Sequence, residues 1–353
     1  MASTFRFSLV LGGGGLKGLA HIGVFRALAE RGLEPAAVVG CSMGSLVAAA
    51  WARGRTIEEM ENRALAVQRT DIFRIAHLDM AIRRMLAPAV YRREPLDALI
   101  DSLVGDVTFR ELPRRLVINT VDLNTGDQIL WGLPGLDHVR VADAVFASCA
   151  LPGILPPRAV DGRVCVDGAV LENLPVRAAV AISRDPIIGV DIGGTRVERS
   201  GTERKGFAAT YSRGLEIVMQ TLAAERLRDW SEPPIVLIRP RVERVSMFAF
   251  NRTPYLIAEG YRATNEALDH LPRELDSLPP GLHPQREMRV IVDPAKCIGC
   301  GACVARSPET FVMGPDRIAR ARVERQWWSP VSDYLLTACP THAITAEQVW
   351  PPR

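Results

Sequence analysis

A serine bracketed by glycines has the residue type and spacing of a nucleophile. Residues 40–44, GCSMG, fit the pattern G-x-S-x-G, in which the two glycines permit a tight strand-to-helix turn that exposes the serine hydroxyl. The apolar run 36–39 just before it predicts the strand, and helical periodicity follows. The pattern predicts Ser42 as the nucleophile of an acyl transfer, on an elbow bounded by Gly40 and Gly44.

A second glycine-rich turn precedes the elbow. Residues 13–18, GGGLKG, fit G-x-G-x-x-G between a predicted strand and a predicted helix. Dinucleotide sites use the same pattern, but they also need an acidic residue at the end of the second strand. Here the second strand runs into the serine elbow instead. Glycine N–H groups beside an elbow serine could form an oxyanion hole.

The base that would activate Ser42 is not an obvious histidine. An ordinary α/β-hydrolase has several strands before its nucleophile, then Asp and His after it. Only one β–α unit precedes Ser42, and none of the six histidines is a convincing partner. His21 lies among apolar helix residues, which favours a structural role. Asp167 follows the apolar run 164–166, and a carboxylate there is costly unless it is paired or used, although Asp-Gly pairs also commonly cap turns.

Together these stretches resemble a patatin-like phospholipase domain over residues of about 5–195. The resemblance rests on four ordered motifs: 12–18 followed by AHIGV, 40–44, 147–157 (ASCALPGILPP), and 167–169 (DGA) followed by ENLP at 172–175. It implies an α/β fold with a parallel sheet sandwiched by helices, and a Ser–Asp dyad without histidine. Ser42 would be the nucleophile and Asp167 its base.

The same resemblance assigns the oxyanion donors and the reaction. Gly13, Gly14 and Gly15 would supply backbone N–H groups to the oxyanion, and Lys17 stands where the family usually has Arg or Lys. The implied reaction is hydrolysis of a lipid or other acyl ester through an acyl-enzyme, as in phospholipases A, lysophospholipases and carboxylesterases.

A cysteine run near the C-terminus has the spacing of an iron–sulfur site. Cys297, Cys300 and Cys303 form C-x2-C-x2-C, but Ser307 stands where a fourth cysteine usually precedes proline. In two-cluster ferredoxins that fourth cysteine ligates the other cluster, so Ser307 removes a ligand from a second cluster only. The distant Cys339, also followed by proline, is the predicted fourth ligand.

Residues 288–353 thus resemble a single-cluster bacterial ferredoxin domain, a small α+β fold holding one [4Fe-4S] cluster. A four-cysteine zinc site normally pairs two C-x2-C knuckles, and a disulfide between Cys297 and Cys300 would leave the other two cysteines unexplained. A [3Fe-4S] form after oxidation stays open. The remaining cysteines, Cys41, Cys149 and Cys165, are interpreted as small buried residues.

The predicted elements fit two domains in the 353 residues. Strands are expected at 5–11, 36–39, 116–121, 187–190 and 235–238, helices at 16–31 and 42–53, a helix-initiating capping box at 56–59, and a hairpin turn at 161–162. Alternation of strand and helix predicts a parallel sheet. We expect a hydrolase domain over 5–272 (core 5–195), a linker over 273–287 rich in proline, and a ferredoxin-type domain over 288–353.

Composition narrows the functional class. A net charge of +3 gives no argument for nucleic acid, and seven cysteines do not fit a secreted disulfide framework. The first residues lack a signal peptide, and no run of 18 uncharged apolar residues predicts a membrane span, so a cytoplasmic protein is expected. The basic amphipathic segment 71–93 leaves open a peripheral contact with anionic lipid, although such helices more often pack on their own domain.

Two functions remain open at this point. The first is a serine lipid acyl hydrolase whose ferredoxin-type tail senses redox state or meets a redox partner protein. The second is an electron-transfer protein whose patatin-like domain binds lipid or acyl groups without turnover. The presence of Ser42, Asp167 and the glycine run together favours the first, because a binder needs none of them to be reactive.

Overall fold

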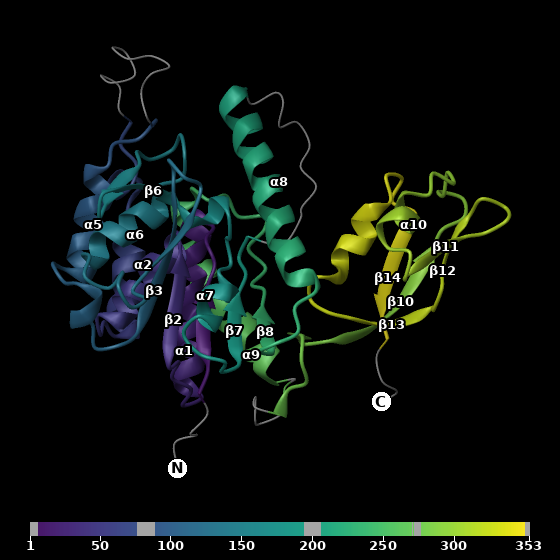
Figure 1. Ribbon diagram of the computed structural model, residues 1–353, viewed down its shortest axis with the longest axis horizontal. Helices are drawn as coiled ribbons and strands as arrows, with labels where there is room; N and C mark the ends of the chain where they lie inside the picture. Colours follow the sequence, from purple (N-terminus) through teal and green to yellow (C-terminus); the bar gives the residue numbers. More distant parts are fainter. Residues whose placement is uncertain (1–5, 76–88, 194–205, 270, 272–276, 350–353) are drawn as a thin grey trace. The chain divides into compact units, whose positions relative to one another are not determined.

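The computed structural model describes residues 6–75, 89–193, 206–269, 271 and 277–349 (Figure 1). These residues form two compact units, one within 1–223 and 232–279 and the other within 224–231 and 280–353. The first four residues of the expected linker, 273–276, lie outside the described part of the chain. So does most of the basic segment 71–93, whose described ends form a β-bridge between Ile75 and Tyr91 rather than a helix.

The larger unit is built on one mixed sheet. Its strands are β1 (Ser8–Leu11), β2 (Ala37–Cys41), β3 (Leu116–Asp122), β4 (Gln128–Trp131), β5 (Arg158–Val160), β6 (Arg163–Asp167), β7 (Ile187–Val190) and β8 (Ile235–Ile238). The order is β5-β6-β3-β2-β1-β7-β8, with β4 also paired to β3. Every residue of β1, β2, β3, β7 and β8 is buried, as expected for strands covered on both faces.

The strand directions differ across the sheet. The pairs β3–β2, β2–β1, β1–β7 and β7–β8 are parallel, so the expected parallel sheet is confirmed there. The pairs β3–β4, β3–β6 and β5–β6 are antiparallel. The turn at Asp161 and Gly162 joins β5 to β6 with both residues at positive φ, which is the geometry of a tight hairpin.

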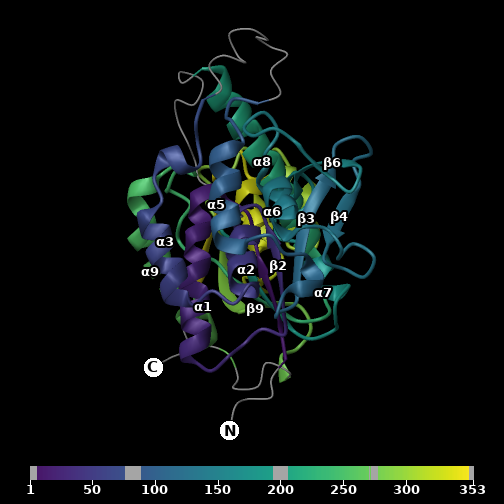
Figure 2. The same cartoon turned by 90° about the vertical axis from the view of Figure 1, so that its left-hand side faces the viewer.

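Helices flank this sheet. They are α1 (Ala20–Glu30), α2 (Met43–Ala52), α3 (Ile57–Ala66), α5 (Glu94–Val104), α6 (Val141–Cys149), α7 (Val176–Val180) and α9 (Thr253–Asp269). Helix α8 (Phe207–Arg228) begins in the larger unit and ends in the smaller one. Helix α2 packs on β2 and β3, α6 on β3 and β6, and α7 on β1, β2 and β7 (Figures 1 and 2). All ten residues of α2 are buried, so the helix that follows the serine is central to the core.

One predicted helix start is confirmed, and one predicted helix is divided into two. The capping box at α3 is present, with the Thr56 side chain accepting from Glu59 N–H and the Glu59 carboxylate accepting from Thr56 N–H. The single helix expected over 16–31 is instead a short 3-10 helix, Gly15–Leu19, followed by α1.

Helices α1 and α9 approach closely enough for their backbones to touch. A Cβ added to Gly23 of α1 would lie 1.9 Å from the carbonyl oxygen of Ile257, and one added to Gly260 of α9 would lie 1.9 Å from that of Ala20. Only glycine fits at either position. The pair fixes α9 against the helix that follows the glycine run.

The smaller unit has a thin core under a three-stranded antiparallel sheet, order β13-β10-β14. Its elements are β9 (Leu282–His283), β10 (Arg286–Val292), α10 (Ala302–Arg306), β11 (Phe311–Met313), β12 (Ala319–Ala321), β13 (Arg325–Trp328) and β14 (Ile344–Gln348). Val290, Phe311, Trp328 and Leu335 are among the few large side chains buried together here, with Cys303 beside them.

Candidate functional site

Ser42 occupies a strained turn between β2 and α2. It is the N-cap of α2 with φ 53° and ψ −129°, a region that non-glycine residues seldom adopt. A Cβ on Gly44 would lie 2.4 Å from the carbonyl oxygen of Leu11, and one on Gly40 would lie 2.5 Å from Cα of Ser45. A side chain at either glycine would clash with the backbone of a neighbouring segment, so both positions require glycine.

Strand register carries Asp167 to the elbow. Cys41 at the end of β2 pairs with Asn119 of β3, and the next residue of β3, Thr120, pairs with Asp167 of β6. Asp167 thus ends a strand that runs antiparallel to its neighbour β3. Gly168 then turns over Asn119, where an added Cβ would lie 2.5 Å from the Asn119 side-chain nitrogen.

Asp167 is buried among hydrogen-bond donors. Its side chain is almost fully enclosed, and its Oδ1 accepts from the Ala169 N–H at 2.9 Å and from the Cys41 thiol at 3.7 Å. Burial raises the pKa of Asp167 from 3.8 to about 6, against the opposing effect of hydrogen bonds from Ala169, the Ser42 side chain and Cys41. A carboxylate with this pKa is a far better proton acceptor at neutral pH than an ordinary aspartate.

The backbone of Ser42 is anchored by a chain of polar contacts that sequence reasoning missed. The Ser42 N–H donates to Ser148 Oγ at 2.8 Å, and the Ser148 hydroxyl donates to the Asn119 carbonyl at 2.7 Å. The Asn119 amide in turn donates to the Glu172 carbonyl at 2.8 Å. Ser148 and Glu172 lie inside two of the quoted motifs, 147–157 and 172–175, so the signal was present without an assigned role.

The glycine run is held from several sides. The Gly13 N–H donates to the Asn173 carbonyl at 3.2 Å, and the Asn173 side-chain amide donates back to the Gly13 carbonyl at 3.1 Å. The Leu16 N–H donates to the Met247 carbonyl at 3.0 Å. Among described residues, no carbonyl accepts from the N–H of Gly14 or Gly15. Of the three predicted oxyanion donors, Gly13 therefore already has a partner, and the other two have none there.

His21 supports the same run. Its Nε2 lies 2.8 Å from the Gly12 carbonyl oxygen, which fixes the tautomer with the proton on that nitrogen. Complete burial lowers the pKa of His21 to about 4, although the bond to Gly12 opposes this. The imidazole is therefore neutral at physiological pH and positions backbone, in line with the structural role expected for it.

The four C-terminal cysteines surround one cavity of the smaller unit. Cys297, Cys300, Cys303 and Cys339 line it together with mainly apolar side chains, and its empty volume is about 310 Å³. Ser307 does not line the cavity. Its fully buried hydroxyl has no partner within the described residues. The donor set and the apolar walls fit a cluster held by four thiolates.

The thiols of this cavity differ in environment. Burial raises the pKa of Cys303. Burial also raises the pKa of Cys339, but hydrogen bonds from the Thr341 hydroxyl and from nearby backbone N–H groups outweigh it and leave that pKa lowered. The Ala343 N–H to Cys339 Sγ distance is 3.3 Å. No group of three or more His, Cys, Asp or Glu residues in the described chain is arranged to hold a single metal ion, whereas cluster thiolates each bind a different iron.

Two known families match separate parts of the chain, one containing the serine elbow and the other the cysteine cavity. Residues 9–180 match the family described as patatin-like phospholipase, and residues 292–346 match the 4Fe-4S single cluster domain of ferredoxin I. The first range contains the elbow, the glycine run and Asp167, and the second contains all four cysteines of the cavity.

Among curated relatives, an uncharacterized NTE family protein of Mycobacterium tuberculosis is 34% identical over 194 residues, 55% of this chain and 51% of its own length. Lysophospholipase NTE1 of Mycosarcoma maydis is 28% identical over 294 residues, 74% of this chain and 14% of its own. The chain spans about half the length of the first curated relatives it matches.

Among solved structures, VipD from Legionella pneumophila aligns with a TM-score of 0.39 at 15% identity, covering 75% of this chain and 66% of its own. Within the residues that the structure describes, every helix is too short or too polar to cross a bilayer.

Proposed function

We propose that this chain is a serine hydrolase of lipid acyl esters. The premise is that residues 9–180 form a patatin-like phospholipase domain and residues 292–346 a single-cluster ferredoxin domain. The observation that carries the proposal is the position of Asp167. Burial raises the pKa of its carboxylate to about 6, and the side chain of the strained elbow residue Ser42 is among the groups that act on that pKa.

In the proposed reaction, Asp167 takes the proton of the Ser42 hydroxyl as its oxygen attacks the ester carbonyl carbon. The carbonyl π electrons move to the oxygen, which becomes an oxyanion held by the N–H groups of Gly14 and Gly15. The intermediate collapses, the alcohol leaves with the proton from Asp167, and an acyl-Ser42 ester remains. Water, deprotonated by Asp167, then releases the carboxylic acid and restores Ser42.

The positioning residues act before the chemistry starts. His21 and Asn173 hold the start of the glycine run, at Gly12 and Gly13, and Ser148 fixes the Ser42 backbone. Fixed donors cost no reorganisation when charge develops on the oxyanion. Because the base is buried, the site works without a histidine.

The four cysteines of the smaller unit are proposed to hold one [4Fe-4S] cluster, with domain limits of 5–272 and 288–353 for the two modules. A bound cluster supplies one-electron transfer there. The chain's own contribution is to enclose Cys303 and to direct the Ala343 N–H at Cys339, a contact that would raise the reduction potential of a thiolate-bound cluster by stabilising added negative charge.

The proposal is tested with the full chain on a short-chain aryl ester and on a lysophospholipid, with the cluster oxidised, reduced and removed. Ser42→Ala and Asp167→Asn should each lower turnover by about four orders of magnitude or more, with unchanged circular dichroism. A fluorophosphonate probe should label wild type at Ser42 regardless of which ester is preferred. Ser102→Ala, on the helix α5, is the matched control and should behave as wild type.

Two results would contradict the proposal. Undiminished hydrolysis by Ser42→Ala would remove the nucleophile, and labelling at another residue would do the same. Lipid binding without turnover in wild type would favour the electron-transfer reading, in which the patatin-like domain only docks the chain on acyl groups.

A further inference from the structure

A turn at the end of β7 lies beside the glycine run. Strand β7 pairs in parallel with β1, and Leu11, the last residue of β1, is level with Val190, the last residue of β7. The Gly12 N–H then donates to the Val190 carbonyl at 3.1 Å. Both strands therefore end at the same edge of the sheet, where open α/β sheets bind their ligands. The residues that follow β7, 191–193, are named the β7 turn.

The β7 turn contacts the hydrogen bond that orients Gly13. A Cβ added to Gly193 would lie 2.7 Å from the Asn173 side-chain nitrogen and 3.4 Å from the Gly13 carbonyl oxygen. These are the two atoms that the Asn173–Gly13 hydrogen bond joins. A Cβ on Gly14 would lie 3.0 Å from Cδ1 of Ile192. The turn therefore packs against the first two of the three glycines that were predicted to bind the oxyanion.

Both backbone polar groups of Gly193 are held by side chains. Its N–H donates to Oδ1 of Asp191 at 3.2 Å, and its carbonyl accepts from Nε2 of Gln220 at 2.9 Å. Asp191 also forms an ion pair with Arg239, whose Nε and Nη2 each lie 3.1 Å from Asp191 Oδ2. Because Asp191 and Gln220 are buried, water competes little for these hydrogen bonds.

The three side chains that hold the β7 turn come from different elements of the larger unit. Asp191 follows β7, Arg239 follows β8, and Gln220 belongs to α8. A buried ion pair contributes little net stability, because the desolvation of both charges offsets their attraction. Its position at a strand end beside the glycine run favours a role in fixing geometry. All three residues lie beyond residue 180, where the match to the phospholipase family stops.

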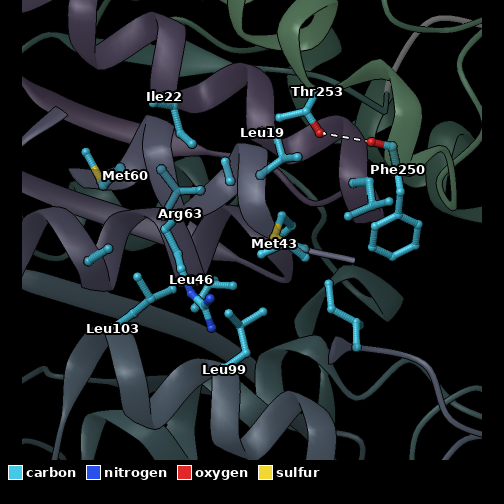
Figure 3. A pocket seen from close by; sticks show the side chains of 16 residues that line it. Leu19, Ile22, Met43, Leu46, Met60, Arg63, Leu99, Leu103, Phe250 and Thr253 are labelled. Carbon is cyan, nitrogen blue, oxygen red and sulfur yellow. Dashed lines mark hydrogen bonds between the residues drawn. The ribbon is translucent and has the colours of Figure 1, made fainter. Parts of the chain in front are cut away.

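The other end of the glycine run is supported by backbone. A Cβ on Gly15 would lie 2.8 Å from the Met247 carbonyl oxygen, which also accepts from the Leu16 N–H. The same segment continues to Phe250, whose carbonyl accepts from the Thr253 hydroxyl at 3.2 Å, drawn as a dashed line in Figure 3. The predicted oxyanion donors therefore lie between this segment and the β7 turn. The β7 turn is held by side chains, which substitution can remove.

We propose that Gln220 and the Asp191–Arg239 ion pair are positioning residues of the oxyanion site. Through the β7 turn they keep the Asn173 amide on the Gly13 carbonyl, and that contact fixes the direction of the N–H groups that follow. Donors fixed in advance stabilise an oxyanion more than donors that must first reorient. The inference rests on the proposed hydrolase function, and it gives residues of β7, β8 and α8 a part in stabilising the transition state.

The test removes the Gln220 donor and keeps the size of the side chain. Gln220→Met in the full chain takes this donor from the Gly193 carbonyl, so we expect kcat to fall about tenfold with little change in KM. The rate is expressed per active site, counted by fluorophosphonate labelling of Ser42, so that unfolded protein does not contribute. Gln326 also donates its side-chain amide to a backbone carbonyl, but in the smaller unit. Gln326→Met is therefore the matched control and should keep the wild-type kcat.

A double variant distinguishes positioning from a general loss of packing. If Gln220 acts through Asn173, Gln220→Met/Asn173→Ala should be at most about twofold slower than Asn173→Ala alone, because the amide to be held is gone. Independent damage would multiply the two losses. The pH at which kcat/KM is half maximal should be the same in Gln220→Met as in wild type, since the base Asp167 is unchanged. A wild-type kcat in Gln220→Met, multiplied losses or a shifted midpoint would each overturn the inference.

Hydrogen exchange separates this inference from the function on which it rests. In Gln220→Met the backbone amides of residues 12–16 should exchange about tenfold faster than in wild type, and those of residues 43–52 should not change. This result without any Ser42-dependent hydrolysis would overturn the proposed function and leave the support of the glycine run by the β7 turn in place. Unchanged exchange over residues 12–16 would overturn that support, whatever the activity.

Discussion

Asn173 holds Gly13 through both of its backbone polar groups, accepting from the Gly13 N–H at 3.2 Å and donating to the Gly13 carbonyl at 3.1 Å. Its side-chain oxygen is buried and has no partner within the described residues. The asparagine therefore sets the orientation of the peptide from which the next two N–H groups, those of Gly14 and Gly15, project.

Replacing that asparagine should impair the oxyanion site without removing a reacting group. Asn173→Ala is expected to lower kcat by about ten- to a hundredfold with little change in KM, because misdirected donors lose strength mainly in the transition state. Asn173→Asp should be worse, since a negative charge would face the Gly13 carbonyl and the developing oxyanion. Steady-state kinetics on one ester distinguish these outcomes, and equal losses in both variants would contradict the charge argument.

The raised pKa of Asp167 predicts a specific pH profile. Only the ionised carboxylate can accept the Ser42 proton, so kcat/KM should rise with pH and reach half its maximum near the pKa of about 6. Below that pH the rate should fall about tenfold per unit. A profile flat between pH 5 and 8, or one falling with pH there, would contradict Asp167 as the base.

The raised pKa of Asp167 also affects the free energy of unfolding, which should fall as pH rises, whereas kcat/KM should increase. The folded pKa of about 6 lies above the reference value of 3.8, so the folded chain binds the extra proton between about pH 4 and 6. Stability from this group is full below that window and falls as pH rises through it, by up to about 3 kcal/mol. Asp167→Asn should therefore be inactive yet more resistant to urea than wild type at pH 8, with little difference at pH 4.

The Cys41 thiol should tune this base. It donates to Asp167 Oδ1 at 3.7 Å, which stabilises the ionised form. Cys41→Ala is expected to move the midpoint of the kcat/KM profile upward, and Cys41→Ser, with a stronger donor, should hold it or move it downward. A structural role alone would lower activity in both variants without moving the midpoint, so the pH profile is the deciding measurement.

Two glycines offer a matched test of the backbone argument. Gly44→Ala would place Cβ 2.4 Å from the Leu11 carbonyl oxygen, whereas a Cβ at Gly214 of α8 meets nothing within 4 Å. We expect Gly44→Ala to cost about 3 kcal/mol or more and to abolish activity. Gly214→Ala should stabilise the helix by about 0.5–1 kcal/mol. Urea denaturation measures both, and similar effects would contradict the contact at the elbow.

Removal of a cluster ligand should affect the smaller unit alone. Cys339→Ala is expected to lower iron and sulfide content and to melt residues 288–353, because so thin a core depends on its metal for folding. Esterase activity should persist. Cys165→Ala, in β6 of the larger unit, is the control and should keep its iron. Full cluster content in Cys339→Ala would exclude this cysteine as a ligand.

Local signals predicted much of the fold and the site. The capping box at Thr56, the turn at Asp161 and the strained elbow at Ser42 each depend on neighbours within a few residues, so residue type and spacing suffice. The central strands were readable because continuous apolar runs mark buried parallel strands. The division of the helix expected over 16–31 into a 3-10 helix and α1 could not be predicted, since Lys17 and Gly18 fit either type of helix.

Non-local pairing could not be read in this way. The antiparallel approach of β6 to β3, which sets Asp167 one residue from the level of Cys41, depends on which strands find each other. Asn119 gave no motif at all, although its side chain donates to the Cys41 sulfur and its carbonyl accepts from Ser148. Met247 also escaped notice, because a backbone carbonyl that accepts from Leu16 has no signature in the side chain.

The backbone contact between Gly23 and Gly260 sets a limit on any shortened version of this protein. The segment that matches the phospholipase family stops at residue 180, yet α9 lies far beyond it and seals the helix that follows the glycine run. A truncation at that limit would strip α1 of its cover and leave Leu16 without its acceptor at Met247. Gene fragments intended for crystallisation or screening should therefore extend past Asp269, whatever is done with the iron-binding tail.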